Sequence, residues 1–254
     1  MIILRLAYST LILMLISVLS ISCVKYDKPV LNQNEALSSV LWQLAAASEI
    51  DKDYETAASH YNRLYEKDPN DKKVIVAYTR NLRYVGLTNE SIKILKLKLI
   101  QFPDDTNIQM ELGKSQLAAS LINDASDTLV KVIERQPESW EAHSALGIIF
   151  DRVGNYQKAK TAYKRALELS PNNIAVQNNI ALSMAQAGEI NQAINLLEEV
   201  NKDRMAGPQS RQNLAMLYGL KGQLEKVREL SQVDLPKNFV DRNFLIFKQM
   251  RSSQ

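Results

Sequence analysis

The stretch that decides the fold runs from Trp140 to Pro171 and reads WEAHSALGIIFDRVGNYQKAKTAYKRALELSP. Apolar residues recur at helical spacing on both sides of Gly154, so the stretch predicts two short amphipathic helices. Gly154 separates them because glycine readily adopts the left-handed conformation that ends a helix, and Pro171 stops the second. Small residues at Gly147, Ala159 and Ala166 let the two helices approach closely. One such hairpin cannot bury both of its faces, so it needs neighbours.

The neighbours follow at a constant interval of 34 residues. Three kinds of position keep this interval: the prolines that stop second helices, the glycines of the turns, and small residues on the helices. They are Pro69, Pro103, Pro137 and Pro171; Gly86, Gly154, Gly188 and Gly222; Gly113 and Gly147; and Ala57, Ala125, Ala159 and Ala193. Ser91 fills the gap in the alanine series, and Ser120 replaces one turn glycine. Independent hairpins would not keep all these positions in register, so the chain contains an internal repeat.

The order of small, aromatic, small and proline residues resembles the tetratricopeptide repeat. The resemblance covers about residues 38–241, in six units, and is most specific in the fourth. It implies an all-α solenoid of helical hairpins, which we expect over residues 37–250 with a C-terminal capping helix. In the first unit we expect Leu41, Leu44 and Ala45 to pack inward. Trp42 is either a partner contact or a packing residue.

The composition argues against several functions. Lys and Arg number 31 against 28 for Asp and Glu, and no basic block with interleaved aromatics suggests nucleic-acid binding. The single cysteine and the two histidines, His60 and His143, form no metal-ligand or catalytic pattern. We therefore predict no catalytic residues, no metal and no cofactor.

Residues 1–22 differ from the rest of the chain. Arg5 precedes an apolar run from Leu6 to Leu19, followed by small polar residues and Cys23, as in a secretory signal. The segment Leu19-Ser20-Ile21-Ser22-Cys23 resembles the bacterial lipobox, in which the cysteine becomes the lipidated first residue. Ser20 departs from the leucine that is usual at its place, and an unprocessed helix with an incidental cysteine is the alternative. Residues 23–36 read as a lipidated cysteine followed by a flexible tether.

Val24 follows the cysteine where an aspartate would retain a lipoprotein at the inner membrane in enteric-type sorting. We therefore expect an outer-membrane lipoprotein that faces the periplasm.

After the sixth unit, a helix from about Lys237 to Met250 is expected to cover the end of the array. Its apolar residues are Phe239, Val240, Phe244, Leu245 and Phe247.

The last third of the chain resembles a narrower group, the TadD family of lipoproteins of tight-adherence (Flp) pilus assembly. The matching segments are the paired asparagines Asn178 and Asn179, the run Arg211 to Ala215, and the pair Asp234 and Leu235. The resemblance implies an accessory lipoprotein that assembles or places the outer-membrane secretin and its pilus machine. A scaffold for outer-membrane protein insertion or peptidoglycan work is the alternative, and an enzyme with a helical-repeat regulatory part is a third class.

Stacked hairpins present their first helices as a surface that can hold an extended peptide. Counting from the fourth unit, cations and amides fall at the places that face this groove, and they suit a peptide backbone and an acidic group. A solvated polar face without a ligand is the alternative. The expected groove residues are Arg80, Tyr84, Met110, Lys114, Arg152, Asn178, Asn179, Gln186, Gln212 and Asn213.

Overall fold

The regular structure that the computed structural model describes, within residues 33–252, is entirely helical. Side chains are described from residue 35 to residue 249. The chain divides at Val40–Leu41, and the packing below concerns the unit that begins at Leu41. The thirteen helices of the described range are α2 (Gln33–Ile50), α3 (Tyr54–Lys67), α4 (Lys72–Tyr84), α5 (Thr88–Gln101), α6 (Thr106–Ala118), α7 (Ile122–Arg135), α8 (Trp140–Arg152), α9 (Tyr156–Leu169), α10 (Ile174–Gln186), α11 (Ile190–Val200), α12 (Pro208–Leu220), α13 (Leu224–Ser231) and α14 (Lys237–Ser252).

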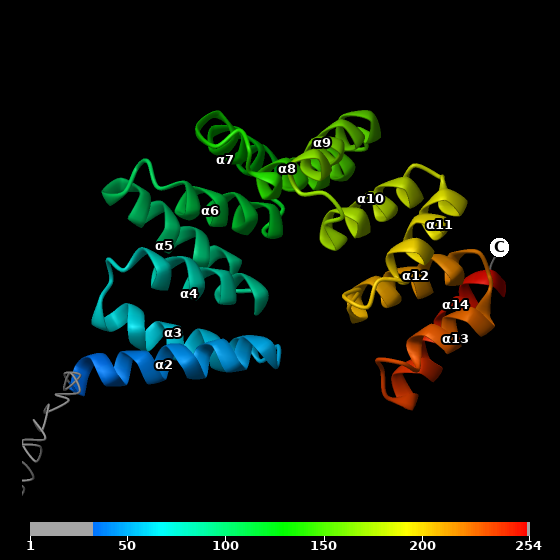
Figure 1. Ribbon diagram of the computed structural model, residues 1–254, viewed down its shortest axis with the longest axis horizontal. Helices are drawn as coiled ribbons and strands as arrows, with labels where there is room; N and C mark the ends of the chain where they lie inside the picture. The colour runs from blue at the N-terminus through cyan, green and yellow to red at the C-terminus, as the bar shows by residue number, and fades with distance from the viewer. Residues whose placement is uncertain (1–32, 253–254) are drawn as a thin grey trace, which may run out of the picture. The chain divides into compact units, whose positions relative to one another are not determined.

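Consecutive helices pack as hairpins, and each hairpin packs on the next (Figure 1). The pairs α4/α5, α6/α7, α8/α9, α10/α11 and α12/α13 each form one unit, and α14 packs against α12 and α13. The first helices also contact each other in order, from α4 to α6, α8, α10 and α12. The predicted solenoid of about six hairpins with a terminal helix is confirmed.

The turns inside the hairpins share one backbone conformation. Six residues spaced 34 apart have a positive φ: Lys52 at 60°, Gly86 at 86°, Ser120 at 60°, Gly154 at 72°, Gly188 at 88° and Gly222 at 74°. The prediction of left-handed turn glycines is confirmed, and Ser120 adopts the same conformation as the glycines. Lys52 extends the series to the first unit, which the sequence pattern alone did not reveal.

The connections between hairpins are also periodic. Pro103, Pro137 and Pro171 each lie two residues beyond the end of α5, α7 and α9. Each following first helix begins with a side chain that accepts hydrogen bonds from its first amides, as an N-cap residue does. These caps are Asp71, Asp105, Ser139 and Asn173, again 34 residues apart.

The fourth hairpin is packed through its small residues. Ala159 and Ala166 are fully buried, and Tyr163 is 1% exposed. Tyr163 lies over Gly147, where an added Cβ would be 2.6 Å from the Cζ atom of the ring. The aromatic ring therefore fills the space that the glycine leaves.

Four expectations need correction. Leu44, expected in the core, is 46% exposed because Leu41 and Ala45 already occupy the buried side of α2. Phe239 and Leu245, expected to cover the end of the array, are 49% and 54% exposed, since α14 turns Val240 inward instead. Helix α2 begins at Gln33, inside the segment predicted to be a tether.

Trp42 packs edge-on against Tyr61 of α3, with ring centroids 5.2 Å apart. This contact favours the packing role over the partner contact. The signal segment 1–22, Cys23 and most of the expected tether lie outside the described residues. Among the described helices, none combines the length and apolarity needed to cross a membrane.

Candidate partner-binding face

The first helices α4, α6, α8, α10 and α12 lie next to one another and together form what we call the A-helix face. All ten expected groove residues lie on these helices. Helical spacing would put them on one side of the first helices, with the opposite side against the second helices. Their environments nevertheless differ along the array.

Basic side chains gather at the amino-terminal half of the face. Arg80 donates to Glu49 at 2.6 Å, and the same carboxylate accepts from Asn81 at 2.7 Å and from Tyr61 at 3.2 Å. Burial raises the pKa of Tyr61 to about 12, and Glu49 contributes to the same rise. The phenol is therefore a permanent donor at neutral pH, and Glu49 neutralises Arg80.

Arg83 is the residue that the groove prediction missed. Its Nε lies 2.7 Å from the Glu111 carboxylate, and its guanidinium stacks over the Tyr84 ring at 4.5 Å. The Tyr84 side chain is itself 49% exposed. Arg83 is basic like Arg80 and lies three residues after it. The register counted from the fourth unit nevertheless gives Arg83 no groove position.

Lys114 stands next to this pair without an ion-pair partner of its own among the described residues. Burial lowers the pKa of Lys114; nearby Glu111 raises it, and Arg83 lowers it again. Arg83 already donates to both oxygens of the Glu111 carboxylate. Lys114 is therefore the partly buried cation of the A-helix face that retains the capacity to bind an anion.

The middle of the face is more polar and partly occupied. Met110 is half-buried and lines an open pocket of about 610 Å³ together with Thr106, Asn107 and Glu141. Arg152 donates to the Leu117 carbonyl at 3.1 Å and to the Ser120 hydroxyl at 3.3 Å. Arg152 thus ties α8 to the turn of the preceding hairpin.

The amides of the carboxy-terminal half mostly hold the helices together. Asn213 donates to Asn178 at 2.9 Å, and both side chains are buried. Asn179 donates to Ser144 at 3.2 Å. These bonds join residues 35 apart on adjacent first helices, so the amides serve stacking rather than an open groove.

Arg211 and Asp234, two residues of the TadD-like segments, form a two-point ion pair. Their atoms approach to 2.5 Å and 2.8 Å, and Gln212 adds a 3.5 Å contact to the same carboxylate. Arg211 also donates to the Ala206 carbonyl at 2.9 Å.

Gln186 is the exposed member of the predicted groove residues in the carboxy-terminal half.

No group of His, Cys, Asp and Glu in the described range is arranged to hold a metal ion. The geometry therefore defines a class of protein: a solenoid of helical hairpins that presents a continuous face of first helices with one unneutralised, partly buried lysine among the described residues.

Comparisons with known proteins narrow the class. Residues 140–173 match the tetratricopeptide repeat family, and this is the stretch with the most specific pattern. The TPR protein TTC0263 of Thermus thermophilus has a similar fold, with a TM-score of 0.66 at 17% identity over 71% of this chain and 98% of that chain. The chain thus contains a tetratricopeptide repeat at residues 140–173, within a solenoid of stacked helical hairpins.

Two relatives align over longer stretches. The chain is 28% identical to "Uncharacterized protein y4yS" of Sinorhizobium fredii over 184 residues, 71% of this chain and 86% of the relative. It is 24% identical to the TPR repeat-containing protein YpiA of Bacillus subtilis over 204 residues, 80% of this chain. That alignment spans about half of YpiA, 48% of its length. Together the comparisons support the repeat fold and a role in protein–protein interaction. They do not support a pilus role specifically.

Proposed function

We propose that the A-helix face binds an extended segment of a partner protein that carries a carboxylate, and that Lys114 receives this carboxylate. The observation that carries the proposal is the environment of Lys114: partly buried, close to two neutralised arginines, and without an ion pair among the described residues. A lysine in such a place gains a charge-assisted hydrogen bond when an acidic group arrives. Tyr84 offers an exposed ring next to Arg83.

The test uses one charge reversal and a matched control. Lys114→Glu should weaken capture of the partner by about tenfold or more, because a hydrogen bond between charged groups contributes about 1.5–3 kcal/mol. Lys96→Glu makes the same change at an exposed site on α5 and should leave capture unchanged. Affinity is measured by surface plasmon resonance on the partner recovered by cross-linking. Equal loss in both variants, or none in either, would reject this face.

For the cellular role, we propose a non-enzymatic scaffold that helps assemble the Flp pilus and acts on its secretin or associated components. The support is the resemblance of residues 174–247 to TadD lipoproteins. A scaffold for outer-membrane protein insertion or peptidoglycan machinery is the second candidate. Affinity purification that recovers a secretin supports the first, and recovery of a barrel-insertion factor instead supports the second.

The proposed anchor is a lipid on Cys23 that holds the protein at the outer membrane, facing the periplasm. Several acyl chains would make the attachment lasting, since each buried CH₂ contributes about 0.8 kcal/mol. Growth with labelled palmitate should label the wild type but not Cys23→Ser. Labelling of both proteins would exclude this cysteine, and sucrose-gradient fractionation would locate the membrane.

A further inference from the structure

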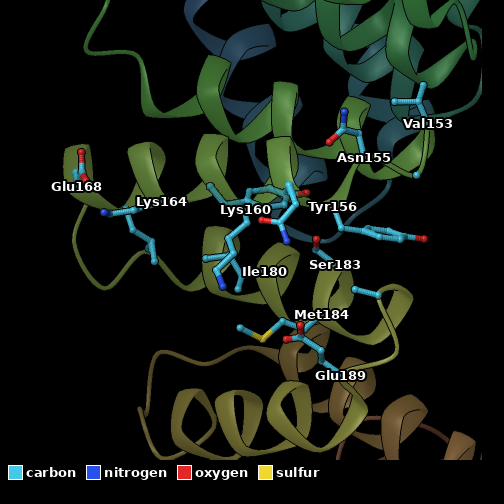
Figure 2. Close-up of a pocket in the computed structure, with 15 residues that line it drawn as sticks. Val153, Asn155, Tyr156, Lys160, Lys164, Glu168, Ile180, Ser183, Met184 and Glu189 are labelled. Atoms are coloured by element: carbon cyan, nitrogen blue, oxygen red, sulfur yellow. The ribbon is translucent and has the colours of Figure 1, made fainter.

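An open pocket of about 990 Å³ lies between the second helix of the fourth hairpin and the first helix of the fifth (Figure 2). One wall is formed by α9, which contributes Lys160, Lys164 and Leu167. The other wall is formed by α10, which contributes Ile180 and Met184. Most of the lining surface is apolar, and lysines stand on the α9 wall.

The pocket is separate from the A-helix face. On α10, Ile180 and Met184 are four residues apart and lie on the side that meets α9. Asn179 and Gln186, seven residues apart, project from another side of the same helix. A ligand in the pocket would therefore leave the A-helix face free.

The flanking hairpins fill the equivalent place with an aromatic ring. Positions 34 residues before and after Met184 hold Phe150 and Tyr218. A lysine lies over each ring: Lys158 is 5.7 Å from the centroid of Phe150, and Lys226 is 4.3 Å from that of Tyr218. In the fifth hairpin both members change, because the partner of Met184 at this interval is Gln192.

The junction that carries Tyr218 in place of Met184 has a smaller pocket. Residues Glu198, Leu214 and Tyr218 line the corresponding pocket of the next junction, which measures about 410 Å³. They are the counterparts of Lys164, Ile180 and Met184 at the same 34-residue interval. Methionine is flexible and lacks a ring, so the slot that Tyr218 fills in one junction is open in the other.

Charge indicates what the open slot would accept. Tyr218 donates its hydroxyl to Glu198, and the counterpart of Glu198 is Lys164. Among the described residues, neither Lys160 nor Lys164 has an ion-pair partner, whereas Glu168 on the same wall is paired with Arg165 at 3.2 Å. Glu189 is the other carboxylate of the lining. Two unpaired lysines on the α9 wall, beside an apolar slot, suit a ring with carboxylates next to it.

We propose that this pocket binds a phenylalanine or tyrosine side chain from an acidic segment of a partner protein. The ring enters the slot between Ile180 and Met184, and carboxylates that flank the ring pair with Lys160 and Lys164. The site is additional to the A-helix face, and it stands even if that face binds nothing.

The probe is a capped acidic pentapeptide with phenylalanine at its centre, compared with the same peptide carrying alanine. The full-length protein, held in lipid nanodiscs and labelled at its methionine methyl groups, is titrated and followed by NMR. The Met184 signal should shift with the phenylalanine peptide, while that of Met205, which is 80% exposed in the connection between α11 and α12 and does not line the pocket, should not. The alanine peptide should bind about tenfold more weakly, since it lacks the buried ring.

Two variants test the mechanism. Met184→Phe introduces the ring that the fourth hairpin carries at this position, as Phe150. The ring should occupy the slot and weaken binding of the phenylalanine peptide about tenfold. Because that change removes the reporting methyl, its affinity is read by calorimetry, with thermal unfolding as a check of the fold. Lys160→Glu with Lys164→Glu should weaken binding similarly, whereas Lys131→Glu, the same kind of change at an exposed site on α7, should have no effect.

Several results would overturn the proposal. They are an unmoved Met184 signal, equal affinity for the two peptides, and unchanged affinity in folded Met184→Phe. A Met184 signal that shifts with protein concentration in the absence of peptide would assign the slot to a second copy of this chain and would also overturn it. The comparison of the two peptides uses the wild type alone, so it decides the question even if a variant fails to fold.

Discussion

At the scale of single residues, the turn position of each hairpin imposes the same conformation on different amino acids. Lys52 adopts a φ of 60° where the fourth hairpin has Gly154 at 72°. A residue with a Cβ atom is strained in this region, and glycine is not. Replacing a non-glycine residue here by glycine should therefore stabilise the fold.

The first prediction concerns this turn. Lys52→Gly should raise the free energy of unfolding by about 0.5–1 kcal/mol, because relief of the left-handed strain exceeds the added entropy of the unfolded chain. Lys96→Gly, the same replacement within α5, should lower it by about 1 kcal/mol. Urea unfolding followed by circular dichroism measures both. A loss of stability in Lys52→Gly would show that its side chain contributes more than its backbone strain costs.

The second prediction concerns the contact between Gly147 and Tyr163. Their counterparts in the fifth hairpin are Ala181 and Leu197. The larger residue on the first helix there is thus paired with a smaller side chain on the second helix. Gly147→Ala should cost about 1–3 kcal/mol, because the new Cβ meets a buried ring that is held at 2.8 Å by Asp151. In the background Tyr163→Leu, the same alanine should cost nothing further, since leucine leaves room for it.

A double-mutant cycle read by urea unfolding measures this coupling. Additive effects of the two substitutions would mean that the ring moves away from the alanine at little cost. Ala175→Val, at an exposed site on α10, serves as the control for adding bulk to a first helix.

At the scale of helices, the connection between α13 and α14 is held by the pair Arg211–Asp234. The hydrogen bond from Arg211 is the main cause that keeps the pKa of Asp234 below its ordinary value. A carboxyl whose pKa is depressed by folding stabilises the fold above its unfolded pKa, and this contribution is lost as the pH falls through the folded pKa.

The third prediction follows from that sign. Asp234→Asn should lower the free energy of unfolding by about 1–2 kcal/mol at pH 7, because a charged pair becomes a neutral contact. The difference from the wild type should shrink as the pH falls below about 4, where the wild-type carboxyl is protonated as well. Thermal unfolding from pH 7 to pH 3 gives the comparison. A difference that stays constant over this range would exclude the ion pair as its cause.

The helices themselves were predictable from the sequence because their signals are local and repeated. Glycine turns such as Gly188 and stops such as Pro137 act within a few residues, and the 34-residue interval places them in register. The caps Asp71, Asp105, Ser139 and Asn173 were overlooked although they keep the same interval. A search for capping side chains after each proline would have found them.

The face of each first helix was predictable only in part. Counting from the fourth hairpin puts Asn178 and Asn213 at groove places, but the structure buries them against each other. Whether such an amide faces a groove or a neighbouring helix depends on how closely adjacent first helices approach. Spacing along the chain does not contain that distance.

Charge pairing shows the same limit. Arg80 and Arg83 have the same charge and differ by three positions, yet one pairs with Glu49 and the other with Glu111. These partners lie 31 and 28 residues away in sequence, on other hairpins. Only the packed structure shows that Lys114, which is partly buried beside these two pairs, has no ion-pair partner among the described residues.

At the scale of the whole array, each hairpin packs on its sequence neighbours, so stability should be distributed by position along the chain. Helix α14 contacts α12 and α13, and the Cδ1 atom of its Phe247 ring lies 2.5 Å from the position that a Cβ on Gly219 would take. The Phe247 ring therefore packs directly on the backbone of α12, the first helix of the sixth hairpin. Removal of the ring should be felt at this end of the array only.

The last prediction tests this locality. Phe247→Ala should lower the free energy of opening of α12 to α14 by about 2–3 kcal/mol, because a half-buried aromatic ring is lost from the end of the core. Leu245→Ala on the same helix should have little effect, since that side chain is 54% exposed. Native-state hydrogen exchange resolves the effect by segment: amides of α12 and α13 should exchange faster, while those of α4 to α8 keep the wild-type rates. Faster exchange throughout the array would instead mean that the hairpins unfold as one cooperative unit, in which case the separate contributions of neighbouring hairpins could not be distinguished.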